Sequence, residues 1–394
     1  MIEKFIDKIG QPFSKGQALE KFKPAWSAAE TFLLTPSEVT SSGPHVRDAV
    51  DLKRYMVMVV LAILPCAFFG VWNTGYQSLT AAGMDASFLP CFIQGLARFL
   101  PLYLVTLAAG GTIEAIFAVV RKHEINEGFL VTSLLFPLTL PPTLPLWMAA
   151  VGIIFGVLIG KEVFGGTGMN IFNPALTARC FLFFAFAKYM SGGTEVWVAP
   201  PLELTDSFPF YAEITVDGLS GATPLMAAYL PEVNVLEQYS TMDMFFGFIP
   251  GSIGETSAFL AFVGAIMLII MGIGSYKTML GCVIGALGTS SLFYLFHPEG
   301  ASELATMAPC YHLIMGGFAF GAVFMATDPA SSPATGKGKW IYGILIGVVA
   351  ILVRTINPAY PEGMMLAILF LNLFAPLIDH YVMEGQIKRR LARG

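Results

Sequence analysis

The sequence predicts an all-α protein that crosses a membrane many times. Of its 394 residues, 55% are hydrophobic and only 12% are charged, whereas a typical soluble domain carries about 25% charged residues. The charged residues gather in short segments between long apolar runs. Because a membrane helix needs about 20 consecutive apolar residues, these runs predict membrane-spanning helices.

We expect about ten such helices, divided between a first membrane half, 55–187, and a second, 244–381. Pro137, Pro141 and Pro174 interrupt the third and fifth spans. We therefore expect those spans to be broken or re-entrant, which a membrane protein tolerates only where the backbone is buried in protein or lines a cavity. The expected spans are 55–74, 98–120, 128–142, 145–162, 171–187, 256–274, 278–296, 310–327, 340–356 and 362–381.

The distribution of charge predicts the orientation. Basic residues crowd the N-terminal arm, 1–54, and the C-terminal tail, 382–394. Between Lys188 and Lys277 there is no lysine or arginine, while acidic residues accumulate in the long loop 188–243. Since cytoplasmic loops carry the excess of basic residues, both termini are expected in the cytoplasm and the loop outside a bacterial inner membrane.

Two stretches, 147–175 and 340–359, share a tryptophan, a Gly-Val pair and an Asn-Pro-Ala sequence in the same order. Chance similarity in a glycine-rich chain is the alternative interpretation. If the stretches are duplicates, each half contains five helices, and an odd number gives the second half the opposite orientation. The sequence therefore predicts two inverted five-helix repeats, as in many transport folds.

The external loop contains a short motif with an exposed-looking hydroxyl at Thr223. Pro224 pushes Thr223 toward an extended backbone, and the residues before it are small, so the hydroxyl is expected to be openly presented for covalent modification. A simple turn is the alternative, because these residue types favour turns. The motif is Asp217, Gly218, Leu219, Ser220, Gly221, Ala222, Thr223 and Pro224.

This motif resembles the flavin-attachment sequence of the family that contains the B subunits of sodium-pumping NADH:quinone reductases and the D subunits of Rnf complexes. Segments 45–54, 121–129, 161–168 and 357–365 extend the resemblance over nearly the whole chain. The long N-terminal arm favours the sodium-pump branch over the Rnf branch.

The resemblance implies a function. It implies that Thr223 carries FMN through a phosphoester bond made by a separate flavin transferase, with Asp217, Ser220, Gly221 and Ala222 as the recognition motif. It also implies a second, non-covalent riboflavin, and electrons passing from FMN through riboflavin to a quinone such as ubiquinone, coupled to Na⁺ export. NADH would be oxidised on a partner subunit, and the expected partners are the A, C, D, E and F subunits.

Two asparagines are candidates for the riboflavin site. The glycine-rich segment 164–170 does not follow a strand and lacks the spacing of a dinucleotide-binding motif, so we expect a tight turn there. Asn170 ends this segment and Asn173 follows it, and their amides could bond the rim of an isoalloxazine ring. Capping of a helix by asparagine is the alternative.

A carboxylate within the second span, Glu114, is a candidate for the quinone or ion route, because a membrane-embedded acid is costly. Gly110 and Gly111 would let a flat ring approach the backbone beside it. The alternatives for Glu114 are an interfacial anchor or a buried ion pair. Asp379 is a second candidate for this route, with interfacial anchoring as its alternative.

Other classes of site are not indicated by the sequence. The five cysteines are scattered singly and the five histidines lie in loops or near span ends, so no metal, haem or iron–sulfur site is expected. Nothing indicates nucleic-acid binding, and lipid is the expected surroundings. Arg179 and Arg354 lie within spans and are expected to pair with acids or phosphate. A channel or secondary transporter without a redox role remains the alternative function.

Overall fold

The computed structural model describes residues 12, 26, 52–121, 128–190, 196–204, 211–213, 221–230, 234–297, 302–358 and 360–393. These residues form a bundle of helices, and the strands among them are a short antiparallel hairpin of β1 (Leu202–Leu204) and β2 (Tyr211–Glu213). The predicted fold class, an all-α membrane protein, is therefore confirmed.

Six helices of the described chain are long and apolar enough to cross a membrane. Three shorter apolar helices lie among them, and the breaks expected at proline are present, since α5 ends just after Pro137 and α7 begins at Pro174. The long helices are α3 (Leu52–Ala81), α4 (Phe88–Arg121), α6 (Leu146–Gly160), α13 (Tyr276–Phe296), α17 (Gly336–Ile356) and α18 (Met364–Leu391), and the short ones α5 (Gly128–Leu138), α7 (Pro174–Ala185) and α12 (Ala258–Ile270).

The span expected at 310–327 is not a single helix, so this part of the prediction is wrong. It consists of α15 (Tyr311–Ile314), α16 (Phe318–Phe320) and the π-helical turn η4 (Gly321–Met325). The break falls at Gly316, whose φ of +63° is accessible mainly to glycine. With this broken segment, the six long and three short helices occupy all ten expected positions, although ten membrane crossings remain a prediction.

A buried arginine stabilises this break by bonding backbone carbonyls. The side chain of Arg354 has no exposed surface, and its guanidinium donates hydrogen bonds to the carbonyls of His312 (2.6 Å), Met315 (3.0 Å) and Glu362 (2.9 Å). The Glu362 carboxylate in turn accepts a hydrogen bond from the Gly317 amide at 2.7 Å. Backbone groups that the broken helix cannot pair are thus satisfied by side chains.

A second non-helical region is satisfied by backbone pairing between distant segments. The chain after α5 meets the chain before α12, where Gly254 N donates to Leu138 O at 2.7 Å and Ile253 N donates to Leu140 O at 3.2 Å. Irregular backbone is viable at membrane depth when it is paired within the protein in this way.

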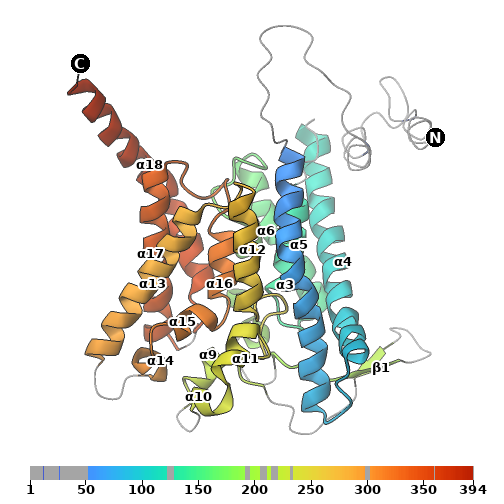
Figure 1. Cartoon of the computed structure of the whole chain (residues 1–394). Coiled ribbons are helices and arrows are strands. Elements are labelled where there is room, and N and C mark those ends of the chain that lie inside the picture. The colour runs from blue at the N-terminus through green and yellow to red at the C-terminus, as the bar shows by residue number, and fades with distance from the viewer. Residues whose placement is uncertain are drawn as a thin grey trace.

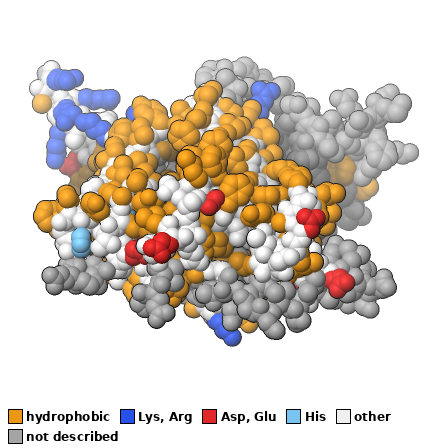
Figure 2. Space-filling model, turned by 60° about the horizontal axis from the view of Figure 1, so that its bottom comes forward, with side chains coloured by type: hydrophobic (Ala, Val, Ile, Leu, Met, Phe, Trp, Pro, Cys, Tyr) orange, Lys and Arg blue, Asp and Glu red, His pale blue; other side chains and the backbone are white. Residues whose placement is uncertain are grey.

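The bundle has two distinct ends (Figure 1). Helix α3 begins and α18 finishes at one end, the top in Figure 1. The opposite end carries the short helices α9 (Pro224–Ala227), α10 (Val235–Gln238), α11 (Thr241–Phe246) and α14 (Glu303–Thr306). Acidic side chains are visible over this second end in Figure 2, where most visible lysines and arginines gather at the far left, on the tail of the chain.

The packing of the two halves is partly equivalent. Helix α6 packs on α4 and α7, and α17 packs likewise on α13 and α18. However, α3 packs extensively on α4, whereas α12 packs on α3 rather than on α13 within the described chain. The inverted repeat therefore stays a prediction.

Glycines allow α13 and α17 to cross at backbone contact. Each helix carries a G-x-x-x-G sequence, Gly281 and Gly285 on α13 and Gly343 and Gly347 on α17. A Cβ added at Gly285 would lie 2.1 Å from Ile344 O, and one at Gly347 would lie 2.2 Å from Cys282 O. Small residues four apart are a known means of close helix packing in membranes.

We therefore expect Gly285→Ala to force the two helices apart and to destabilise the protein by about 1–3 kcal/mol, the usual cost of overpacking. Gly288 is the matched control, because it lies on the same helix with nothing within 4 Å of an added Cβ. Thermal unfolding in detergent measures the effect. Equal stability of Gly285→Ala and Gly288→Ala would contradict the proposed close crossing.

Candidate functional site

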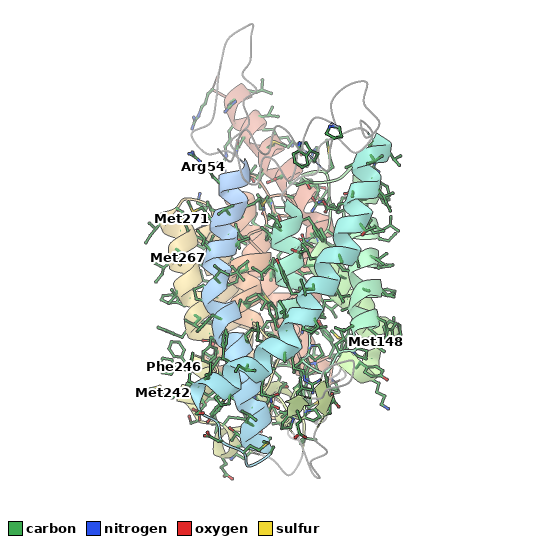
Figure 3. All side chains as sticks on the ribbon, turned by 90° about the vertical axis from the view of Figure 1, so that its right-hand side faces the viewer. Arg54, Met148, Met242, Phe246, Met267 and Met271 are labelled. Carbon is green, nitrogen blue, oxygen red and sulfur yellow. The ribbon has the colours of Figure 1, made fainter. Side chains whose placement is uncertain are left out.

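A cavity of about 340 Å³ lies where several helices end. We call it the asparagine cavity. It lies at the end of the bundle where α3 begins: Figure 3 labels Arg54 and Met271 toward that end and Met148, near the start of α6, toward the other. Its polar lining consists of Tyr55, Thr132, Lys161, Thr167, Asn170, Asn173, Thr327 and Asp328.

Both expected asparagines line this cavity, and both are buried. The Asn170 carboxamide accepts a hydrogen bond from Gly168 N (3.1 Å) and donates one to Phe172 O (2.9 Å). The Asn173 oxygen accepts from Ala175 N and Leu176 N, which caps α7. The capping alternative is thus confirmed for Asn173, and it is compatible with a place in the cavity wall.

The loop that carries Asn170 is the tight turn that was expected. Gly165, Gly166 and Gly168 all have positive φ, between 86° and 126°. The turn folds Thr167 against the cavity, where its hydroxyl oxygen is buried and has no hydrogen-bond partner among the described residues. A buried hydroxyl without a partner is costly, so Thr167 marks a position where a polar ligand atom would be stabilised.

Asp328 faces the same cavity from the second half of the chain. Its carboxylate accepts hydrogen bonds from Ala330 N (3.1 Å) and the Ser331 hydroxyl (2.9 Å), and lies 3.5 Å from Asn173 Nδ2. Burial raises the pKa of Asp328, against these two hydrogen bonds, which lower it. Neither Asp328 nor Thr167 was singled out from the sequence: Asp328 lies in no motif, and Thr167 lies in the glycine-rich segment without a signal of its own.

Glu114 forms a buried ion pair with Lys161, and both side chains are about 95% buried. An interfacial anchor would be exposed, so that alternative for Glu114 is wrong. One residue further along the chain, the Glu162 carboxylate pairs with Arg121 at 3.2 Å. Two ion pairs therefore join the end of α4 to the end of α6. Lys161 also lines the asparagine cavity, whereas Glu114 does not.

The glycines beside Glu114 contact a ring of the protein itself. A Cβ added at Gly110 would lie 2.5 Å from Phe129 Cζ and 2.9 Å from Ile153 Cγ1, and one at Gly111 would lie 3.5 Å from Phe129 Cε1. Gly110 thus permits close packing between α4, α5 and α6. Its role as a quinone contact stays a prediction.

Asp379 contacts the loop that precedes α17. Its carboxylate accepts hydrogen bonds from Ala334 N (2.6 Å), Thr335 N (3.1 Å) and the Thr335 hydroxyl. Thr335 in turn caps α17. These contacts give Asp379 a structural role in joining α18 to α17, and its place on an ion route stays a prediction.

A second, smaller cavity of about 50 Å³ surrounds Thr223, and we call it the threonine cavity. Thr223 has the extended backbone expected before proline (φ −66°, ψ 155°), and its hydroxyl accepts a hydrogen bond from Met226 N, capping α9. The residue is half-buried, so the hydroxyl is less open than the sequence suggested. The other polar residues that line the threonine cavity are Arg179, Ser252, Glu255, Thr256, Tyr360 and Glu362.

Arg179 is the cationic side chain that lines the threonine cavity in the described chain. It is 5% exposed, and its guanidinium contacts Glu255 Oε1 (3.0 Å), Glu255 Oε2 (3.1 Å) and the Ser252 hydroxyl (3.3 Å). The expected pairing of Arg179 with an acid is confirmed. Arg354 lies 3.9 Å from Glu362, which lines the same cavity.

The residues before Thr223 are packed into the protein. A Cβ added at Gly221 would lie 2.1 Å from Val198 Cγ2, and Ala222 is buried. The Tyr239 hydroxyl donates to Ala222 O at 2.6 Å, and burial raises the pKa of Tyr239 to about 12, so it remains a donor. Asp217 and Ser220 lie outside the described residues. Within those residues, no group of three or more His, Cys, Asp or Glu side chains could hold a metal ion.

Comparison with known proteins agrees with this picture. Residues 39–388 match the NQR2, RnfD, RnfE family. A protein of Stutzerimonas stutzeri, named as the B subunit of the Na(+)-translocating NADH-quinone reductase, is 50% identical, with 100% of this chain and 99% of the relative aligned. Proteins of the same name from Azotobacter vinelandii and Klebsiella pneumoniae are 49% and 44% identical, over all of this chain and 99% and 100% of theirs. The chain belongs to the NQR2, RnfD, RnfE family.

Proposed function

We propose that this chain is the membrane-embedded B subunit of a Na⁺-translocating NADH:quinone reductase and carries two flavins. The similarity to proteins of that name spans the full length of the chain. The observation that carries the two-flavin proposal is the presence of two cavities at separate levels of the bundle, each lined by residues that the sequence assigned to a flavin.

Thr223, in the wall of the threonine cavity, is the proposed attachment point of covalent FMN, and the cavity volume of about 50 Å³ leaves room for the phosphate but not for the flavin ring. A phosphoester on the Thr223 oxygen adds a negative charge to a cavity whose described lining holds one cation, Arg179, and two carboxylates, Glu255 and Glu362, with Glu255 already paired to Arg179. Bound FMN would supply a redox centre near the end of the bundle that carries α9. The chain's own contribution is the Thr223 oxygen, which would hold the phosphate at the wall of the cavity.

Thr223→Ala is expected to abolish the flavin fluorescence of this subunit in a denaturing gel, because the bond that survives denaturation is lost. Thr241, an exposed threonine in the first turn of α11, provides the matched control, and Thr241→Ala should keep full fluorescence. Fluorescence of the Thr223→Ala band at the control level would refute attachment at this residue.

The asparagine cavity is the proposed site of non-covalent riboflavin. Its volume of about 340 Å³ lies within the usual range for small-molecule sites, about 300–1,000 Å³. The Asn170 and Asn173 carboxamides and the unpaired Thr167 hydroxyl offer donors and acceptors to a planar ring rimmed by both. Bound riboflavin would supply a second redox centre, and the protein would fix its position and polarity.

Asn173→Ser tests this site while preserving the helix cap, because serine caps as well as asparagine. We expect α7 to keep its cap and the complex to assemble, and the riboflavin extracted from the purified complex to fall several-fold. Riboflavin is measured by chromatography after acid extraction, relative to covalent FMN in the same sample. Full riboflavin content in both Asn173→Ser and Asn170→Ser would exclude the cavity as its site.

The remaining parts of the proposed reaction lie partly outside this chain. NADH would be oxidised on a partner subunit, and the A, C, D, E and F subunits would complete the complex. A flavin transferase would load Thr223. Electrons would pass from FMN through riboflavin to ubiquinone, coupled to Na⁺ export, with Gly110, Gly111 and Glu114 and also Asp379 as the proposed quinone and ion route.

We further propose that the end carrying α9 faces outward and that both termini are cytoplasmic in the inner membrane. The acid-rich, lysine-free segment near α9 and the basic tail of α18 support this orientation.

Cysteine labelling tests the orientation in a background where the exposed Cys310 is replaced by serine. Glu203 and Gly385 are both exposed. We expect Glu203→Cys to react with a membrane-impermeant maleimide in intact cells, and Gly385→Cys to react only after the cells are opened. The reverse pattern would overturn the orientation.

A further inference from the structure

The indole N–H of Trp197 is a buried hydrogen-bond donor that has no acceptor among the described residues. The side chain is 7% exposed, and it lines the threonine cavity together with Thr223. A buried tryptophan usually finds a partner for this group, and a donor left unpaired lowers the stability of the protein. An acceptor atom that enters the cavity beside Trp197 would therefore be stabilised.

The segment that carries Trp197 is fixed against the rest of the protein. The Thr143 hydroxyl donates a hydrogen bond to the carbonyl of Val196 at 2.7 Å. On the other side of Trp197, the Val198 side chain lies so close to Gly221 that an added Cβ would be 2.1 Å from Val198 Cγ2. The indole is thus held beside the chain that leads to the attachment point.

The charged groups of the threonine cavity are already engaged. The Arg179 guanidinium contacts both oxygens of Glu255, and the Glu362 carboxylate accepts a hydrogen bond from the Gly317 amide. Among the described lining residues, Trp197 is the one with a buried side-chain nitrogen or oxygen that has no hydrogen-bond partner. A donor is therefore free for an anion without the loss of an existing ion pair.

We propose that the Trp197 N–H donates a hydrogen bond to a phosphate oxygen of the flavin nucleotide joined to Thr223, and so holds α9 closed once the cofactor is attached. The inference rests on the proposed attachment at Thr223. The phosphate would carry one negative charge as a diester, and hydrogen bonds to charged acceptors are stronger than those to neutral ones.

An ordered water molecule is the other occupant that the cavity could hold. The volume of about 50 Å³ exceeds the roughly 10–15 Å³ that one water needs. A water bonded to Trp197 requires no flavin, whereas the phosphate is present only after attachment. The two occupants therefore differ in whether the contribution of the indole N–H depends on the attached flavin.

Hydrogen exchange of the α9 amides in the whole purified complex tests this dependence, because it measures how often the helix opens. The amides of Ala227 and Ala228 bond the carbonyls of Thr223 and Pro224. Complex made with and without the flavin transferase supplies the loaded and the unloaded state. In the loaded state we expect Trp197→Phe to speed exchange of these amides about tenfold or more beyond its effect in the unloaded state, the usual contribution of a hydrogen bond to a charged group.

Comparison of the two states isolates the hydrogen bond, since the smaller phenylalanine ring costs packing in both of them. Trp72→Phe is the matched control. The Trp72 indole N–H is likewise buried and unpaired among the described residues, but Trp72 packs on Tyr76 and Phe248 and does not line the threonine cavity. Its effect on exchange in α9 should be the same in both states.

If Trp197→Phe does not assemble, replacement of Trp197 by benzothienylalanine keeps the bicyclic shape and still removes the N–H. Equal effects on exchange in the loaded and unloaded states would overturn the inference and assign Trp197 to packing or to a bound water. Loss of assembly by both replacements without the transferase would overturn it as well, because the role would then be structural. Failure of the proposed attachment differs from these results: Thr223→Ala would keep its fluorescence in the denaturing gel.

Discussion

Broken helices within an apolar bundle impose the constraint on which the rest of this structure depends. Lipid offers no partner to backbone N–H and C=O groups, so each break must be satisfied from inside the protein. Arg354 donates hydrogen bonds to two carbonyls of the segment broken at Gly316 and to the Glu362 carbonyl before α18, and the chains at Leu138 and Gly254 pair with one another. Glu362, which accepts the Gly317 amide at this break, lines the threonine cavity together with Gly316 and Gly317, so part of the cavity wall follows from how the backbone is satisfied.

The sequence predicted the parts of the fold that depend on local chemistry. Apolar runs gave the helix positions, and Pro137 and Pro174 gave two breaks, because proline removes a backbone donor and restricts the residue before it. The break at Gly316 could not be predicted, since it depends on Arg354, which lies 38 positions further along the chain. A glycine pair in an apolar run is equally compatible with a continuous membrane helix.

In the candidate sites, too, the residues found from the sequence are those marked by local chemistry, and the residues missed are those placed by long-range packing. Thr223, Asn170 and Asn173 were found because motifs or turn chemistry point to them. Lys161, Thr167 and Asp328 reach the asparagine cavity only when helices from both halves are packed, so their nearness is not written in any local pattern. The position of Glu114 within a predicted span could be read from the sequence. Its pairing with Lys161 could not, because it depends on how α4 packs against α6.

The half-buried position of Thr223 has a consequence for biogenesis. Ala222 and Pro224 on either side of it are buried, and the hydroxyl already accepts a hydrogen bond from the backbone amide of Met226. An enzyme that joins a bulky nucleotide to this oxygen needs room that the folded chain does not offer. The proposed attachment at Thr223 would therefore require a chain in which α9 has not yet docked or has transiently opened, so that the cofactor would be joined first and closure would follow.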